Sequence, residues 1–278
     1  MKKIVLLSVL LLFNMFCIAQ KKEKVKGSKI VTVEIKKIEN FESLDVADNL
    51  EVFLVKGSEC GLEIEADDNL HDAIDISISG STLKLETFKT VFGAKKFSIR
   101  ITYTDAFKMV TARNESIVNA LADIELADIS FRAFDEAKLF LNVKSTNFSM
   151  SLDDKSKSEL NLKSQKATIN LAKYTSVKAL VAATNLTFDM YQKSEATVEG
   201  GVEELKMRLD NNSEFSGKKF TAKVANVTTE SLSKCTINVM TKLVLSASGN
   251  SEIDLYGDNK IDMVRFADSA ILKKKAIK

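Results

Sequence analysis

Most of the chain after residue 110 alternates apolar and polar residues with a period of two, and this alternation restarts at regular intervals. A small residue begins each stretch and an apolar residue follows two positions later, as in Ser213–Glu214–Phe215. A period of two places successive side chains on opposite faces of a β-strand. The small residues, 17 to 21 positions apart, are Ser116, Ala137, Ser158, Thr175, Ser194, Ser213, Ser233, Ser251 and Ser269.

Each repeat also holds a second alternating piece, such as TNFSMSL or TNLTFDM, after a short polar interruption. Two or more short strands with polar turns fill a step of about 19 residues, which suits one coil of a parallel β-helix. An all-β sandwich is the competing fold, because its strands recur every 8 to 12 residues or so. A sandwich gives no reason for the small residue and its polar neighbour to recur at twice that spacing, so the pattern favours the β-helix.

Turn and strand chemistry agree with this prediction. Asn, Asp, Ser and Lys fill the segments between alternating pieces, and Asn and Asp tolerate left-handed backbone. The 278 residues include no proline, as expected where nearly every strand donates hydrogen bonds to its neighbours. No segment after residue 20 has the apolar spacing of an amphipathic helix.

The repeats are expected to form one body with the preceding segment, because no Pro-rich or Ser-rich linker divides them. Residues 30–110 are predicted to form an N-terminal β region that caps the solenoid and begins its coils. Residues 111–278 are predicted to be the β-helix repeats. A cap is expected because the first and last coils of a solenoid expose unpaired strand edges, and the Lys-rich tail after Ile271 would protect the other end.

Residues 1–19 have the three parts of a secretory signal peptide. Two lysines precede an apolar run from Ile4 to Phe16, and Ala19 precedes the predicted cleavage site. The run is short for a membrane span, and Cys17 lacks the small preceding residue that lipidation usually requires. We expect secretion across the inner membrane to the periplasm, the outer surface or the extracellular space, with no transmembrane segment after cleavage.

Charge is distributed unevenly along the chain. Without the signal peptide the chain has 38 basic and 38 acidic residues, but residues 20–29, a predicted basic linker, hold five lysines and one glutamate. The tail, residues 273–278, holds four lysines, which leaves 29 basic and 37 acidic residues between them. The acidic body and the predicted export argue against a nucleic-acid partner. The basic ends either solubilise the chain or contact an anionic lipid or polysaccharide.

The sequence predicts no catalytic, cofactor-binding or metal site. His71 lies in a polar turn, and no G-x-S-x-G signature accompanies it. Zinc needs three or four Cys or His ligands, whereas the chain after residue 19 offers only His71, Cys60 and Cys235, widely spaced. The Asp-rich turns lack the D-x-[DN]-x-[DN]-G calcium pattern. Cys235 occupies an alternating apolar position, which predicts a buried free thiol in preference to a disulfide.

A carbohydrate-active enzyme, a polysaccharide lyase or hydrolase, is the alternative function, because β-helices host such activities. These enzymes need paired carboxylates and aromatic platforms for sugars, and the chain has no tryptophan. The outward glutamates are predicted to form a solvated ladder. A groove lined by two carboxylates and a Lys or Arg would favour the enzyme. These glutamates are Glu159, Glu195, Glu214 and Glu252.

Three stretches resemble a known family: Phe41–Leu50, Gly80–Leu85 and Leu243–Ala270. Over residues 40 to 273 the chain resembles the head GIN domain family of putative auto-transporter adhesins. The resemblance implies a right-handed parallel β-helix and a secreted or envelope protein of Bacteroidetes-type bacteria, with no defined molecular function. Where the family usually has Gly-Ser-Gly-like turns, this chain has segments such as FDEA and LDNNSE, so properties of a glycine ladder do not carry over.

Together these patterns predict a secreted or cell-envelope, adhesin-like binding or structural protein without catalytic activity. Its partner would be a carbohydrate or protein of a cell surface or matrix, recognised through a repetitive polar face of the solenoid. Many weak contacts along a rigid rod would supply the affinity by avidity. The patterns do not assign particular binding residues or an oligomeric state.

Overall fold

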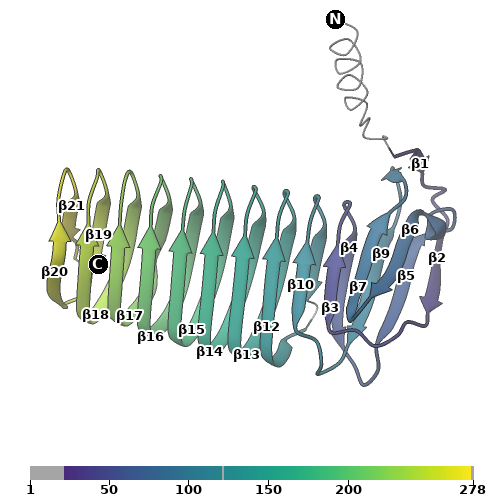
Figure 1. The fold of residues 1–278 in the computed structure, drawn as a ribbon, viewed down its shortest axis with the longest axis horizontal. Helices are drawn as coiled ribbons and strands as arrows, with labels where there is room; N and C mark the ends of the chain where they lie inside the picture. Colours follow the sequence, from purple (N-terminus) through teal and green to yellow (C-terminus); the bar gives the residue numbers. More distant parts are fainter. Residues whose placement is uncertain (1–21, 121, 277–278) are drawn as a thin grey trace, which may run out of the picture.

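The computed structural model describes residues 22–120 and 122–276, so the predicted signal peptide lies outside the described residues. The chain is 68% strand and 1% helix and forms a β-solenoid of about nine turns with rungs about 19 residues apart. Figure 1 shows a rod of stacked coils with a differently built cap at its N-terminal end. The predicted parallel β-solenoid is confirmed.

Each central coil is a single long strand that bends in the middle, where we expected separate strands. In β13, the inward positions run Leu139, Leu141, Val143 and then, after the bend, Phe148 and Met150. The alternation shifts by one residue at the bend, which lets one continuous strand serve two sheets. These strands are β12 (Ile124–Ala133), β13 (Lys138–Leu152), β14 (Lys157–Leu171), β15 (Ser176–Met190), β16 (Glu195–Leu209), β17 (Glu214–Thr229) and β18 (Lys234–Ala247).

The bent strands stack in parallel register and form two sheets, with the apolar core between them. We name the two outer surfaces face A and face B. Face A comprises the first halves of β13–β18 with β11 (Ile117–Ala120), β4 (Glu51–Lys56), β9 (Phe97–Tyr103), β5 (Gly61–Asp67), β2 (Val31–Lys36), β19 (Glu252–Tyr256) and β21 (Ile271–Lys274). Face B comprises the second halves with β12, β10 (Met109–Ala112), β3 (Ser43–Val46), β7 (Thr82–Thr87), β6 (Ile74–Ser79) and β20 (Lys260–Phe266).

A tight turn joins face B of one coil to face A of the next. Asp135 and Glu136 both have positive φ, 51° and 64°, and the Ala137 N–H donates to the Phe134 carbonyl at 3.0 Å. The turns also stack, because the Glu136 N–H donates to the Asp154 carbonyl of the next coil at 3.0 Å. Asn and Asp adopt this backbone at low cost, so the turns form without a repeated glycine.

The register corrects two of the predicted small residues. Ser158 pairs with Leu139 and Val177 and is therefore in the inward apolar column, whereas Ser156 is the small residue after the turn. At the last coil, Ala270 occupies this position instead of Ser269. SKSE contains serines two positions apart, and the even steps of 19 residues from Ala137 to Ser156 and from Ser156 to Thr175 already favour Ser156. The buried Ser158 hydroxyl has no hydrogen-bond partner among the described residues.

The N-terminal cap closes the core with antiparallel strands. β2 pairs with β5, β5 with β9, and β6 with β7, all antiparallel. The short 3₁₀ turn η2 (His71–Ala73) joins β5 to β6. Inside, Phe41, Tyr103 and Phe107 pack together, with ring centroids 5.8 Å apart for the Phe41–Phe107 pair and 4.9 Å for the Tyr103–Phe107 pair. This end of the core is therefore covered.

Asp67 joins three segments of the cap. Its buried carboxylate accepts hydrogen bonds from the backbone N–H groups of Lys29, Lys95 and Lys96 at 2.8 to 3.1 Å. Burial raises the pKa of Asp67, but the three backbone hydrogen bonds outweigh it and hold the pKa below the ordinary value. The ionised carboxylate is thus the form that the cap stabilises.

The segment expected to be a basic linker, residues 20–29, contributes to the structure. It contains β1 (Lys24–Lys26), which pairs in parallel with β8 (Thr90–Phe92). The expected boundary at residue 110 falls inside β10. Within residues 30–110, where the first coils were expected, β3 and β4 pair with β10 and β11. The N-terminal region and the repeats share the same sheets.

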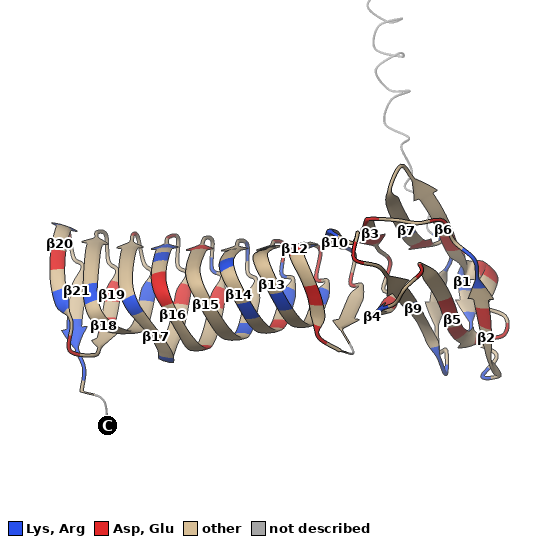
Figure 2. Cartoon of the chain, turned by 90° about the horizontal axis from the view of Figure 1, so that it is seen from below, with Lys and Arg blue, Asp and Glu red and all other residues tan. Residues whose placement is uncertain are grey.

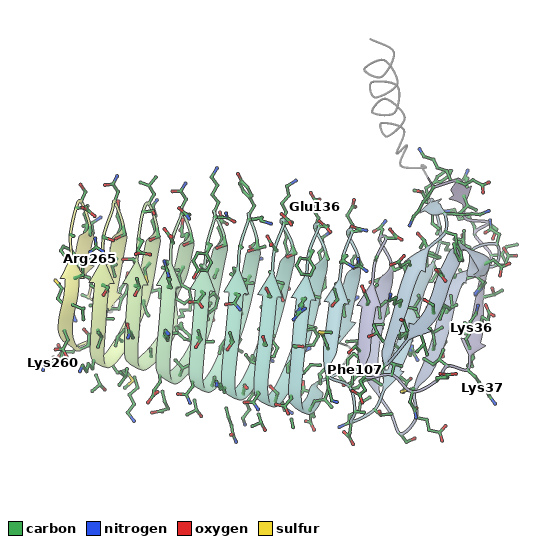
Figure 3. The ribbon with its side chains drawn as sticks, in the orientation of Figure 1. Lys36, Lys37, Phe107, Glu136, Lys260 and Arg265 are labelled. Atoms are coloured by element: carbon green, nitrogen blue, oxygen red, sulfur yellow. The ribbon has the colours of Figure 1, made fainter. Side chains whose placement is uncertain are left out.

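The C-terminal coil has no further coil upon it among the described residues. Leu243 and Leu245 of β18 are fully buried, whereas Met263, opposite Leu245 in β20, is 50% exposed. Phe266 is 42% exposed. Figure 3 shows Lys260 and Arg265 on this terminal coil, Lys36 and Lys37 at the opposite end, and Phe107 where the coils meet the cap.

Candidate binding face

Several charged side chains of the solenoid pair with a residue of the adjacent coil. Lys219 lies 3.1 Å from Glu199 and Lys223 lies 2.9 Å from Glu203, each pair joining β16 to the segment of β17 beside it. Lys155 lies 3.0 Å from Glu136 between neighbouring turns. Figure 2 shows the two signs interspersed along the coils. Such exposed pairs add little stability, but they leave those surfaces electrically balanced.

A hollow of about 450 Å³ opens on face A beside the turns of β13–β16. Lys138, Lys157 and Ser176 are opposite one another in successive coils and form one column of outward positions. The hollow forms where the short Ser176 side chain follows the two lysines. Tyr174 and Lys193, from successive turns, stand at its edge. The lining residues are Lys138, Leu139, Phe140, Lys157, Ser158, Glu159, Tyr174, Thr175, Ser176, Lys178, Lys193 and Glu195.

A second hollow of about 670 Å³ lies on face A toward the bend of the same coils. It shares Phe140, Glu159 and Lys178 with the first. These three residues pair in register across β13, β14 and β15 and so form a ridge between the hollows. Leu180 lines the second hollow and is exposed. A partner lying across the ridge would contact both hollows.

Four lysines gather in the lining of the first hollow. Lys138 and Lys157 are directly opposite each other in register, an arrangement of like charges that destabilises a sheet. Neither forms an ion pair with any residue that the structure describes, and the same holds for Lys193. Lys178 alone has a carboxylate neighbour, Glu159, at 4.0 Å. With four lysines and two glutamates in its lining, the hollow carries a net positive charge.

Aromatic side chains stand beside these lysines. Phe140 points outward from β13 and is exposed, although outward positions are usually polar. Tyr174 is exposed at a turn where its φ is 64°. The Lys193 ammonium lies 5.1 Å from the centre of the Tyr174 ring and 3.3 Å from its hydroxyl. Aromatic rings with an exposed polar group are typical of binding surfaces.

Sequence reasoning did not assign these binding residues, although a signal was present. In KLFLNV, the outward position between two inward leucines is Phe140, and in ALVAA it is Leu180 rather than a charge. An apolar residue at an outward position breaks the alternation. Register was also needed, because only the pairing of β13, β14 and β15 shows that Phe140 and Leu180, two coils apart, line the same hollow.

The predicted glutamate ladder divides into two columns. Glu195, Glu214 and Glu252 lie at equivalent outward positions, separated by Lys234. Glu159 belongs to the next outward column, opposite Phe140 and Lys178. Glu159 and Glu195 nevertheless line the same hollow with lysines, which is the arrangement named above as favouring an enzyme. Both are exposed to water, whereas a glycosidase acid needs burial to raise its pKa.

The remaining residues considered from sequence lie away from these hollows. In the cap, His71 Nε2 is 2.7 Å from the Thr32 hydroxyl. Cys60 and Cys235 are free; burial raises the pKa of the Cys235 thiol to about 12. Among residues 22–120 and 122–276, no three His, Cys, Asp or Glu side chains are arranged to hold a metal, and no helix there is long and apolar enough to cross a membrane.

A rod-shaped solenoid with a hollowed, partly unneutralised face defines a class of protein, one that presents an extended surface to a partner. The family model described as "Putative auto-transporter adhesin, head GIN domain" matches residues 40–259. The chain belongs to this family. The predicted resemblance is confirmed.

Solved structures share the fold at low sequence identity. A putative adhesin from Parabacteroides merdae is 16% identical with a TM-score of 0.63, and one from Parabacteroides distasonis is 12% identical with a TM-score of 0.66; each comparison covers 92% of this chain and 100% of the other. A putative lipid binding protein from Parabacteroides distasonis is 15% identical, with a TM-score of 0.61 and coverage of 91% and 100%. No curated protein matches the chain.

Proposed function

We propose that this protein is an adhesin-like, non-enzymatic binding protein of the cell envelope or its exterior, which holds its partner across the two hollows of face A. The observation that carries this proposal is the set of unpaired lysines beside exposed Phe140 and Tyr174. Family membership supports an adhesin-like role. The signal-like residues 1–19 support export.

The partner suited to this face is a carbohydrate or protein surface that carries negative charge. Lysine ammoniums attract carboxylate or sulfate groups, and aromatic rings contact the apolar faces of sugars or side chains. The hollows are open along the rod, so an extended partner could cover several coils at once. Weak contacts repeated over coils would then combine into useful avidity.

Location can be tested by protease digestion of intact cells compared with lysed cells, using an antibody to the mature chain. We expect digestion on intact cells, as for a protein at the outer surface. Protection until lysis would place the protein in the periplasm and contradict adhesion, while leaving an envelope scaffold role.

Binding can be tested on immobilised acidic and neutral polysaccharides and matrix proteins. We expect wild-type protein to bind an acidic surface and the variant Lys138→Gln/Lys157→Gln to lose most of that binding. The matched control is Lys219→Gln/Lys223→Gln, which removes two lysines that are paired with glutamates. Equal loss in both variants would contradict the proposed site.

A carbohydrate-active enzyme is the second candidate, because Glu159 and Glu195 line one hollow with lysines. Release of reducing ends or unsaturated sugars from an acidic polysaccharide would be measured for wild-type protein and for Glu159→Gln/Glu195→Gln. Activity in the wild type that the variant lacks would establish the enzyme. Absence of product together with retained binding would support the adhesin-like function.

A further inference from the structure

Strands β1 and β8 form a small two-stranded parallel ribbon, separate from the two large sheets, at the N-terminal end of the molecule (Figure 1). Val25 and Val91 are opposite each other in register and pack against the core. The Gly27 N–H also donates to the Phe92 carbonyl at 3.2 Å. These contacts hold the ribbon in a defined position on the cap.

The other face of the ribbon is basic and aromatic. Lys24 is opposite Thr90 and Lys26 is opposite Phe92. Phe88 lies in the bend that leads from β7 into β8. Phe88 is 60% exposed and Phe92 is 48% exposed, and both lysines and Thr90 are exposed too. Two exposed phenylalanines, one in the ribbon and one just before it, need a reason, because water penalises their exposure.

The charge of this face is not neutralised by the protein. Lysines that flank it are paired, Lys22 with Asp48 and Lys89 with Glu23. The two lysines on the face itself form no ion pair with any residue in the described part of the chain. A partner for this face would therefore have to carry negative charge next to an apolar layer.

We propose that the outer face of the β1–β8 ribbon docks onto an anionic lipid bilayer. Lysines attract anionic headgroups, and aromatic rings settle at the boundary between headgroups and acyl chains. Lys24, Lys26 and Phe88 lie outside the hollows of face A. Thr90 and Phe92 also line a hollow of about 630 Å³ that includes Asp48. Lys24, Lys26 and Phe88 lie outside that hollow and are exposed, so they can meet a surface.

This docking site is independent of the proposed function of face A. The hollows lie on β13–β16, on strands that the ribbon does not contact. A protein held at a membrane through its cap would still present the hollows to a partner. Failure of either proposal leaves the other standing, because the two use different residues.

The test is co-sedimentation of the purified chain beginning at Gln20 with lipid vesicles. We expect binding to vesicles of phosphatidylcholine mixed with phosphatidylglycerol and little binding to phosphatidylcholine alone, with binding falling as salt rises. Lys24→Gln/Lys26→Gln should lower the partition coefficient about 25-fold, at about 1 kcal/mol for each lysine near the surface. Phe88→Ser/Phe92→Ser should lower it by about tenfold.

The matched control removes two lysines from the other end of the molecule, Lys273→Gln/Lys274→Gln in β21, and should bind like the wild type. Circular dichroism and thermal melting would check that each variant folds. The proposal is overturned by absence of binding to anionic vesicles, by equal loss in the two lysine variants, or by wild-type binding of the phenylalanine variant. Binding to a soluble acidic polysaccharide without binding to vesicles would also overturn it.

Discussion

At the N-terminal end the core stops against antiparallel strands and a 3₁₀ turn, whereas at the C-terminal end it stops at a coil with no neighbour among the described residues. Phe41 and Tyr103 are buried in the cap, but Met263 and Phe266 of the last coil are about half exposed. The difference teaches that in a solenoid an apolar residue is buried by the adjacent coil, so its contribution depends on position along the rod.

The sharpest way to test this comparison is to truncate one phenylalanine in the middle and one at the open end. Phe188 is fully buried in β15 and packs edge-on against Phe215, with ring centroids 5.4 Å apart. Phe188→Ala should lower the free energy of unfolding by about 3–5 kcal/mol. Phe266→Ala should lower it by less than about 1 kcal/mol. Urea titrations would measure both, and similar losses would show that the last coil is covered in solution.

Substitutions at two glycines with positive φ distinguish the cost of crowding by a neighbouring coil from the cost of backbone strain alone. At Gly200, φ is 105° and an added Cβ would lie 2.1 Å from the Val181 carbonyl oxygen of the preceding coil. Gly80, in the β6–β7 turn of the cap, has φ 61° and nothing within 4 Å. Gly200→Ala should cost about 2–4 kcal/mol, and Gly80→Ala about 1 kcal/mol. Equal costs in thermal melts would contradict the role of coil stacking.

Acid should loosen the cap before it loosens the coils. Because the folded-state pKa of Asp67 is lower than its ordinary value of 3.8, the ionised carboxylate stabilises the cap above that pH. This contribution is lost as pH falls through the folded-state pKa. Hydrogen exchange at Lys29, Lys95 and Lys96 should accelerate selectively at low pH.

Asp67→Asn is the control for the acid prediction. The variant should show faster exchange at these three amides already at neutral pH, with little further change on acidification, because Asn has no proton to gain. An unchanged acid response in the variant would assign the pH effect to another group. Coils distant from the cap, such as β15, provide the internal reference within the same measurement.

The smallest expected effect concerns the stacked lysines of face A. Lys157→Gln removes repulsion with Lys138, which is opposite it in register, and should raise the melting temperature by about 1 °C. The same change should weaken binding to an acidic surface. A substitution that raises the stability of the protein and weakens its binding is typical of a residue in a functional site. A lower melting temperature in the variant would show instead that contacts of Lys157 within the protein stabilise the folded state.

The amino-acid sequence by itself determined the class of fold and much of the local structure. The period of two, the step of about 19 residues and the absence of proline predict stacked parallel coils. The alternating position of Cys235 predicts the buried free thiol that the structure shows. Local pattern suffices here, because alternation and turn chemistry act between residues that are near in sequence.

Only the tertiary structure decided which residues become neighbours. Ser156 gives even steps of 19 residues from Ala137 and to Thr175, but only the paired register shows that Ser158 lies inward, opposite Leu139. The same register brings Lys138 next to Lys157, and Phe140 next to Glu159. The cap required antiparallel pairing between β2 and β5, distant segments without the repeat. These arrangements depend on which of several nearby registers buries most apolar surface, a property of whole coils rather than of any one segment.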